Sequence, residues 1–65
     1  MSAFDIKALA ALRARVEERR QRQLGLLAEG GAEDFADYRF QCGALAALAH
    51  VLDDVEEIRK AMLEG

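Results

Sequence analysis

The chain has no proline, no threonine and a single cysteine, and each of these shortages limits the folds that the chain can adopt. Without proline, nothing in the sequence forces a kink or an extended dipeptide. β-Branched residues, which favour strands, occur only singly, whereas alanine, leucine, glutamate and arginine are abundant and favour helix. The composition therefore predicts an all-α fold.

The lone Cys42 excludes an internal disulfide, and no cluster of cysteine and histidine offers a structural zinc site. In chains shorter than roughly 70–80 residues, the hydrophobic core rarely contributes more than about 3–5 kcal/mol to folding stability. Such chains are usually stabilised by disulfides, by metal sites or by oligomerisation. For a chain of 65 residues, oligomerisation is the expectation that remains. An unpaired thiol also suits a reducing compartment, so we expect a cytoplasmic location.

Features of several functional classes are absent too. No apolar stretch approaches the ~20 residues of a membrane span, so we expect no membrane association. The formal net charge of −3 argues against bulk attraction to nucleic acid. No phosphate-binding glycine loop, catalytic carboxylate pair or nucleophile with a neighbouring base can be assembled. We therefore expect no enzyme, no cofactor and no small-molecule substrate.

One set of residues has metal-ligand chemistry: His50 is followed at offsets of three, four and seven by Asp53, Asp54 and Glu57. Facing helices hold di-iron centres with ligands of these types. The first half of the chain, however, offers no matching pair of carboxylate and histidine. The pattern therefore favours a solvated acidic helix face over a metal site.

Capping signals divide the chain into two helices and one turn. Ser2 is a candidate cap for the first helix, and Gly30-Gly31 can adopt the left-handed conformation that ends it. Asp34 is the preferred cap of the second helix, with Gly31 as the alternative. We predict one helical-hairpin domain over residues 1–65, with a helix over about 3–29, a turn over 30–33 and a helix over about 34–63.

The second helix contains thirteen consecutive uncharged residues, Phe40 to Leu52, although 32% of the chain is charged. A helix that is apolar on most sides needs cover on most sides. One neighbouring helix cannot cover the broad apolar arc, so we expect a larger helical bundle of coiled-coil type, formed with copies of the chain or another protein. The predicted interface arc consists of Leu45, Leu48, Val51, Leu52, Val55, Ile58 and Met62.

Two further groups on the second helix are interface candidates. The back of the helix has mostly small side chains, at Gly43 and Ala47 together with Ala46 and His50. Small side chains permit close approach of another backbone. Alternatively, the alanines only favour helix. Tyr38 lies between Phe35 and Phe40 beside the turn. These aromatic rings either pack over the end of the hairpin or anchor a partner from an exposed position.

The first helix has an apolar stripe, interrupted by polar residues, that contains Ile6, Leu9, Leu12, Val16, Leu24 and Leu27. Arg20 stands within this stripe, where it either extends its head to the edge or pairs with Glu56 and fixes the register. Arg15, Arg19 and Arg22 share one face and suit a phosphate backbone or an acidic partner. Neighbouring glutamates and the lack of a nearby aromatic ring favour a solvated or protein-facing stripe over nucleic acid.

The stretch ADYRFQCGALAALAHVLDDVEEIRKAM resembles small helical proteins of tailed bacteriophages. The resemblance is carried by Tyr38-Arg39, Gly43, Leu45, Leu48 and the acidic block 53–57. It implies a virion or assembly role, with a phage structural protein or further copies as partners, in the host cytoplasm or in the virion. In architecture the expected hairpin is similar to the plasmid regulator Rop, which makes an RNA-binding hairpin dimer the alternative function. A phage inhibitor of a host defence protein, acting through the acidic block, is a third.

Overall fold

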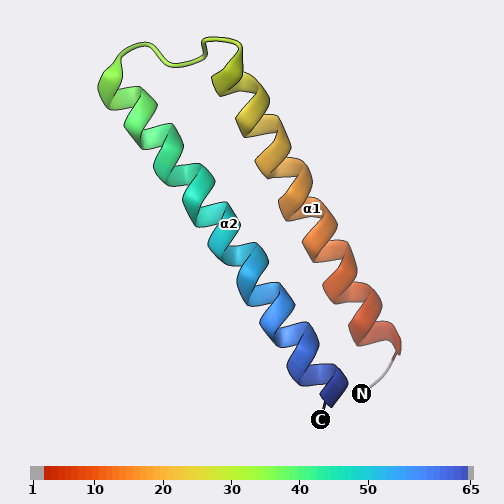
Figure 1. Cartoon of the computed structure of the whole chain (residues 1–65). Helices are drawn as coiled ribbons and strands as arrows, with labels where there is room; N and C mark the ends of the chain where they lie inside the picture. The colour runs from red at the N-terminus through yellow and green to blue at the C-terminus, as the bar shows by residue number, and fades with distance from the viewer. Residues whose placement is uncertain (1–2, 65) are drawn as a thin grey trace.

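The computed structural model describes residues 3–64 and contains two antiparallel helices that lie side by side (Figure 1). Helix α1 spans Ala3–Ala28 and helix α2 spans Phe35–Glu64. The predicted all-α hairpin is confirmed, and each helix ends within one residue of its predicted boundary. Ser2, the candidate cap of α1, lies outside the described residues.

The turn begins with a Schellman motif built on two glycines. Gly30 has a φ of 83°, the left-handed conformation that glycine adopts without strain. Its amide donates to the Leu27 carbonyl at 3.2 Å, and the Gly31 amide donates to the Leu26 carbonyl at 2.9 Å. A Cβ atom on Gly31 would lie 2.6 Å from the Leu26 carbonyl oxygen. Both positions therefore favour glycine, one for its conformation and the other for space.

Helix α2 begins with a side-chain cap. The Asp34 carboxylate accepts a hydrogen bond from the Asp37 amide at 2.8 Å, and the Asp37 carboxylate accepts one from the Glu33 amide at 3.0 Å. Asp34 is thus the cap predicted for this helix, whereas Gly31 belongs to the end of α1. The Gln41 amide group joins the two segments, donating to the Gly31 carbonyl at 3.2 Å and to Asp37 at 3.1 Å.

The two helices enclose very little interior. Val55, 4% exposed, is the one buried side chain among the described residues. The other apolar side chains on the seam between the helices are half-buried: Leu9, Val16 and Leu27 on α1, and Leu45, Leu48, Leu52 and Met62 on α2. The radius of gyration is 15.0 Å, whereas a compact domain of this length has about 11 Å. The hairpin is a single elongated layer.

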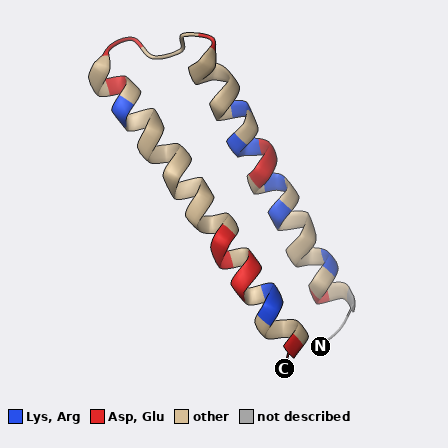
Figure 2. Cartoon of the chain, viewed as in Figure 1, with Lys and Arg blue, Asp and Glu red and all other residues tan. Residues whose placement is uncertain are grey.

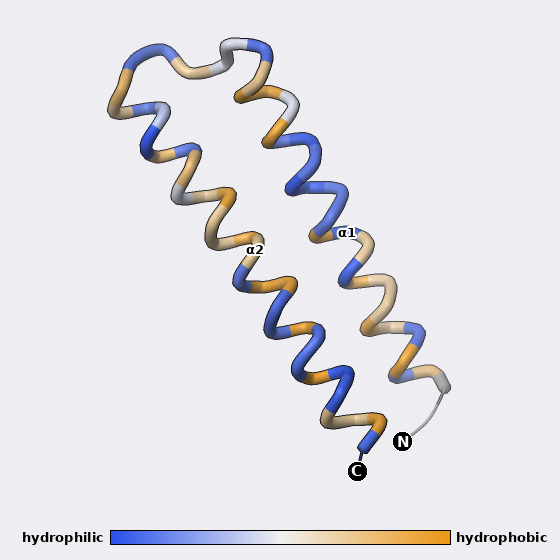
Figure 3. Tube along the Cα trace, viewed as in Figure 1, coloured by the Kyte–Doolittle hydropathy of each residue, from blue (hydrophilic) through white to orange (hydrophobic). Residues whose placement is uncertain are grey.

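Charge and hydropathy are unevenly distributed along this layer. The arginine-rich part of α1 lies beside the uncharged middle of α2, while the acidic part of α2 lies nearer the chain ends (Figure 2). Hydropathic positions recur along both helices, but α1 has a polar stretch over 17–23 (Figure 3). Opposite charges of the two helices are therefore offset along the hairpin, with one cross-helix exception described below.

Candidate protein-protein interface

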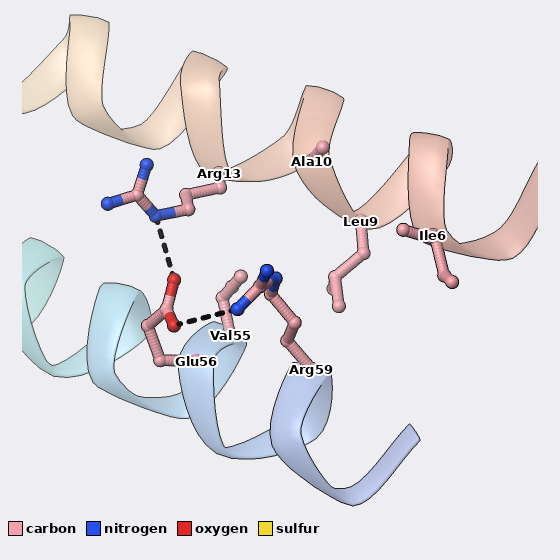
Figure 4. A pocket seen from close by; sticks show the side chains of 7 residues that line it. All are labelled: Ile6, Leu9, Ala10, Arg13, Val55, Glu56 and Arg59. Carbon is pink, nitrogen blue, oxygen red and sulfur yellow. Dashed lines mark ion pairs between the residues drawn. The ribbon is translucent and has the colours of Figure 1, made fainter. Parts of the chain in front are cut away.

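One side of the hairpin carries an ion pair between the helices. Arg13 Nε lies 3.0 Å from Glu56 Oε1, and Arg59 Nη1 lies 3.9 Å from Glu56 Oε2 (Figure 4). Ile6 and Ala10 of α1 line the same groove, and we call this side the bridged face. All three charged side chains are substantially exposed, so the contribution of each pair to stability is about 0–1 kcal/mol. The Arg13–Glu56 pair shows which residues of the two helices lie level.

Arg20 does not pair with Glu56 within the hairpin, which was one of its two predicted alternatives. Arg20 Nη1 lies 3.5 Å from Glu17 Oε1 in its own helix. Arg20 is two helical turns beyond Arg13, about 10 Å further along the axis, and is out of reach of Glu56. It is nevertheless half-buried on the seam, as is Gln23, whose amide donates to Gln41 of α2 at 3.4 Å.

The opposite side, which we call the open face, has no such bridge among the described residues. Its groove near the chain ends is lined by apolar side chains that include Leu12 and Ile58. Residues at successive spacings of three and four from Leu12 on α1 and from Ile58 on α2 lie on the same side of the hairpin. On α1 the open face contains Ala8, Leu12, Arg15, Arg19, Arg22 and Leu26. On α2 it contains Phe40, Ala44, Ala47, Val51, Asp54, Ile58 and Ala61.

Large apolar side chains of the open face are in contact with solvent. The exposed fractions are 50% for Leu12, 52% for Leu26, 75% for Phe40, 40% for Val51 and 50% for Ile58. Large apolar side chains exposed together on one face are typical of an interaction site. The open face is therefore the candidate interface.

The predicted interface arc of α2 is divided between the seam with α1 and the open face. Its members Leu45, Leu48, Leu52, Val55 and Met62 turn toward α1, whereas Val51 and Ile58 lie on the open face. At the back of α2, Gly43 and Ala47 are exposed, and a Cβ atom on Gly43 would meet nothing within 4 Å. The hairpin alone thus leaves part of the arc and all of the small-residue surface uncovered.

The arginine stripe lies in the middle of the open face. Arg15, Arg19 and Arg22 line one surface depression together with Glu18. Arg22 Nη2 is 3.4 Å from Glu18 Oε1, whereas Arg15 and Arg19 form no ion pair within residues 3–64. The acidic residues Asp54 and Glu57 likewise have no ion-pair partner in the described part of the chain. Unused charges of both signs are therefore available to a partner.

The aromatic residues beside the turn do not form a common cluster. Phe35 and Tyr38 stack with ring centroids 6.5 Å apart, while Phe40 projects from the open face. Hydrogen bonding to Cys42 one turn away, together with electrostatic repulsion from that side chain and slight desolvation, raises the pKa of Tyr38 above its ordinary value of 10.0. Phe40 therefore fits the interpretation as an exposed anchor better than packing over the hairpin end.

Two elements of the surface were missed by sequence reasoning. The cross-helix role of Arg13 could have been found, because Arg13 stands four residues after Leu9 and three before Val16, in the repeat that forms the seam. The placement of Leu12 on the open face could not have been found from the sequence, because its spacing also fits the seam. Its placement depends on how α1 is rotated about its axis relative to α2.

Within the described residues, no three metal-ligating side chains come together, and neither helix is long and apolar enough to cross a membrane. Comparisons with protein-family models, curated proteins and solved structures find no significant match to this chain.

Proposed function

We propose that the chain is a non-enzymatic assembly module that acts by protein-protein interaction, through self-association or docking to a larger assembly. The observation that supports this most is the excess of exposed surface. The accessible area of the hairpin is 5100 Å², whereas a compact monomer of its mass exposes about 4,100 Å². The difference of about 1,000 Å² is similar to the ~800 Å² that one partner contributes to a standard interface.

The chemistry of the surface supports the same proposal. The open face offers apolar side chains and unused charges, but no nucleophile paired with a base and no enclosed polar site. Association driven by burial of Leu12, Phe40, Val51 and Ile58 is the activity for which these side chains are suited.

The resemblance to small helical proteins of tailed bacteriophages suggests the biological setting. It rests on Tyr38-Arg39, Gly43 and the leucines that follow. We accordingly propose a phage structural or morphogenesis role, carried out in the host cytoplasm, with the chain retained in the virion if the assembly it joins becomes part of the particle.

RNA binding by a Rop-like dimer is the second candidate, and the grouping of Arg15, Arg19 and Arg22 on one surface favours it. Contacts between arginines and phosphates release counterions, so binding to structured RNA would weaken steeply as salt is raised. Replacing all three arginines by glutamine would abolish such binding. Salt-independent binding, or none, would remove this candidate.

Light scattering on a sizing column, with helicity and thermal melting on the same sample, tests the main proposal. We expect a folded species larger than 7.2 kDa whose melting temperature rises with chain concentration. Ile58→Asp, on the open face, should reduce the mass. Ala14→Asp is the matched control, because it adds the same carboxylate at an exposed position of α1 turned away from both α2 and the open face.

Docking to a larger assembly predicts a different result on the same instruments. The isolated chain would then be a poorly ordered monomer and would be present stoichiometrically in purified particles. A well-folded monomer with concentration-independent melting, absent from any particle or complex, would overturn the proposed function.

A further inference from the structure

The open face carries two stripes with the spacing of coiled-coil contact positions. The α1 and α2 members defined above each recur at alternating intervals of three and four residues. At about 100° per residue, each stripe lies roughly 100° around its helix from the seam that packs on the other helix. Each helix of a four-helix bundle has two neighbours separated by a similar angle. The hairpin therefore has the form of half a bundle.

The ion pair across the seam shows which charged residues of the open face lie level, that is, at the same height along the hairpin. Arg13 Nε lies 3.0 Å from Glu56 Oε1. Because the helices are antiparallel, a step of equal length forward on α1 and back on α2 keeps two positions level. Such a step leads from Arg13 to Arg15 and from Glu56 to Asp54. Arg15 and Asp54 are therefore level, but both point out of the open face and form no ion pair within residues 3–64.

A hairpin can meet a second copy of itself through one face in two symmetric ways. A two-fold axis along the hairpin puts both turns at the same end and stacks α1 of each copy on α2 of the other. A two-fold axis across the hairpin puts the turns at opposite ends and stacks α1 on α1 and α2 on α2. Both arrangements complete a four-helix bundle in which neighbouring helices are antiparallel. The side chains of the open face suit the first arrangement better.

We propose that the open face binds a second copy of this chain, with the turns of both copies at the same end of the dimer. In the resulting four-helix bundle, α1 of each copy packs against α2 of the other. This inference rests on the proposed assembly function and names the partner and its orientation.

Charge complementarity favours this orientation. An axis along the hairpin leaves every height unchanged, so Arg15 of each copy faces Asp54 of the other, and symmetry gives two such pairs. Both side chains lie on the part of their stripe turned away from the seam, which places each pair at the outer edge of the contact. With the turns at opposite ends, full overlap of the hairpins would instead put Arg15 beside Arg19 of the other copy. Like charges would then meet in the middle of the α1–α1 contact.

The arginine stripe and the uncharged run of α2 are complementary in size. Between the ion pair and the amide contact that cross the seam, Arg19 of α1 is level with the region of Ala47 of α2 (Figure 2). In the proposed dimer, the aliphatic stem of Arg19 therefore crosses the small side chain of Ala47 of the other copy, and its head extends to the edge. A long side chain opposite a small one fills the contact without a void.

Apolar side chains form the two ends of the same contact. Ile58 is level with Ala8 of the other copy, and Leu26 is level with Phe40 beside the turn. In the single hairpin the exposed fractions are 50% for Ile58, 52% for Leu26 and 75% for Phe40. Burial of these side chains supplies the driving force for association, while the charge pairs select the orientation.

Charge reversal in the full chain tests the proposal. Arg15→Glu and Asp54→Arg should each raise the dimer dissociation constant about tenfold, since each variant places like charges at both symmetric pairs. An equimolar mixture of the two variants should restore association to near the unmodified value, because both pairs in the mixed dimer join opposite charges. Sedimentation equilibrium measures all three constants. Tighter association of Arg15→Glu would overturn the proposal, because it is the result expected when Arg15 faces an arginine.

Matched controls separate this pairing from net charge. Arg39→Glu and Asp53→Arg make the same charge changes at exposed positions off the open face, and should leave the dissociation constant within about twofold. Single variants that behave like these controls, or a mixture that stays dissociated, would overturn the orientation. The assembly function would stand in that case, since the unmodified chain would still associate.

A distance measurement tests the orientation without relying on charge variants. A spin label on Glu33→Cys in a Cys42→Ser background marks the turn, where the Glu33 side chain is exposed. Turns at the same end predict a distance between the two labels well short of the 47 Å length of the hairpin. A distance close to that length would overturn the proposal. A chain that is monomeric at every concentration but bound in particles would also overturn it, and would leave the proposed function intact.

Discussion

At the scale of single residues, Arg13 and Glu56 mark the alignment of the two helices. Their ion pair at 3.0 Å is the one such contact that crosses the seam in the described part of the chain, whereas Arg20 pairs within α1. A double-mutant cycle of Arg13→Gln and Glu56→Gln should therefore give a coupling energy of about 0.2–1 kcal/mol. Urea unfolding at one fixed chain concentration measures it.

The matched cycle replaces Arg20 and Glu56 in the same way. Because these side chains form no pair, its coupling energy should be near zero. A larger coupling for Arg20 than for Arg13 would contradict the observed arrangement and restore the pairing predicted from sequence.

Tyr38 gives a second test at this scale, because it is the one tyrosine of a chain without tryptophan. Hydrogen bonding to the Cys42 side chain one turn away and electrostatic repulsion from it raise the pKa of Tyr38. The raised pKa means that the folded state holds the proton more tightly than the unfolded state. This contribution to stability is present below pH 10 and is lost as pH rises through the folded-state pKa.

The absorbance of the tyrosinate should therefore titrate above pH 10 in the folded chain. In Cys42→Ala the midpoint should move back toward 10, since both the hydrogen bond and the charge are removed. Identical midpoints in the two proteins would show that Cys42 does not act on Tyr38.

At the scale of elements, a glycine within α1 and a glycine of the turn should respond oppositely to replacement by alanine. Gly31→Ala places a Cβ atom 2.6 Å from a backbone oxygen of α1, so we expect a loss of about 1 kcal/mol or more in the free energy of unfolding. Gly25 lies within α1 with open space around its Cα. Gly25→Ala should therefore stabilise the chain by about 0.5–1 kcal/mol. Thermal or urea unfolding of both variants checks the signs, and two changes of the same sign would contradict this account of the turn.

The helix ends could be predicted from the sequence, whereas the rotation of α1 could not. The caps at Asp34 and Gly30 were predictable because a cap depends on a few adjacent residues. The orientation of α1 was not, because its seam repeat passes through Arg13, Arg20 and Gln23, and polar residues at these positions looked like an interruption. Long side chains can occupy a seam with their aliphatic stems while their heads reach the edge. Because Arg13 occupies the seam position, Leu12 lies on the open face instead of in the seam.

At the scale of the whole molecule, the uncharged run of α2 and the thin interior have one explanation. A layer with Cα extents of 47 × 15 × 10 Å has no room for a second shell of side chains, so Val55 alone is buried among the described residues. A second hairpin on the open face would convert exposed Leu12, Val51 and Ile58 into core.

A substitution at Gly43 should affect the stability of the hairpin and the stability of the assembly in opposite directions. In the single hairpin Gly43→Leu meets open space, and replacing a mid-helix glycine should favour α2 by about 1 kcal/mol. In an assembly whose partner backbone approaches the small residues of α2, however, a leucine side chain at this position would interfere. We therefore expect helicity at low concentration to be unchanged or higher, and the dimer dissociation constant to rise. Circular dichroism and sedimentation on the same samples measure the two effects. Association as strong as in the unmodified chain would show that no backbone approaches Gly43, and that the small residues of α2 serve only to favour helix.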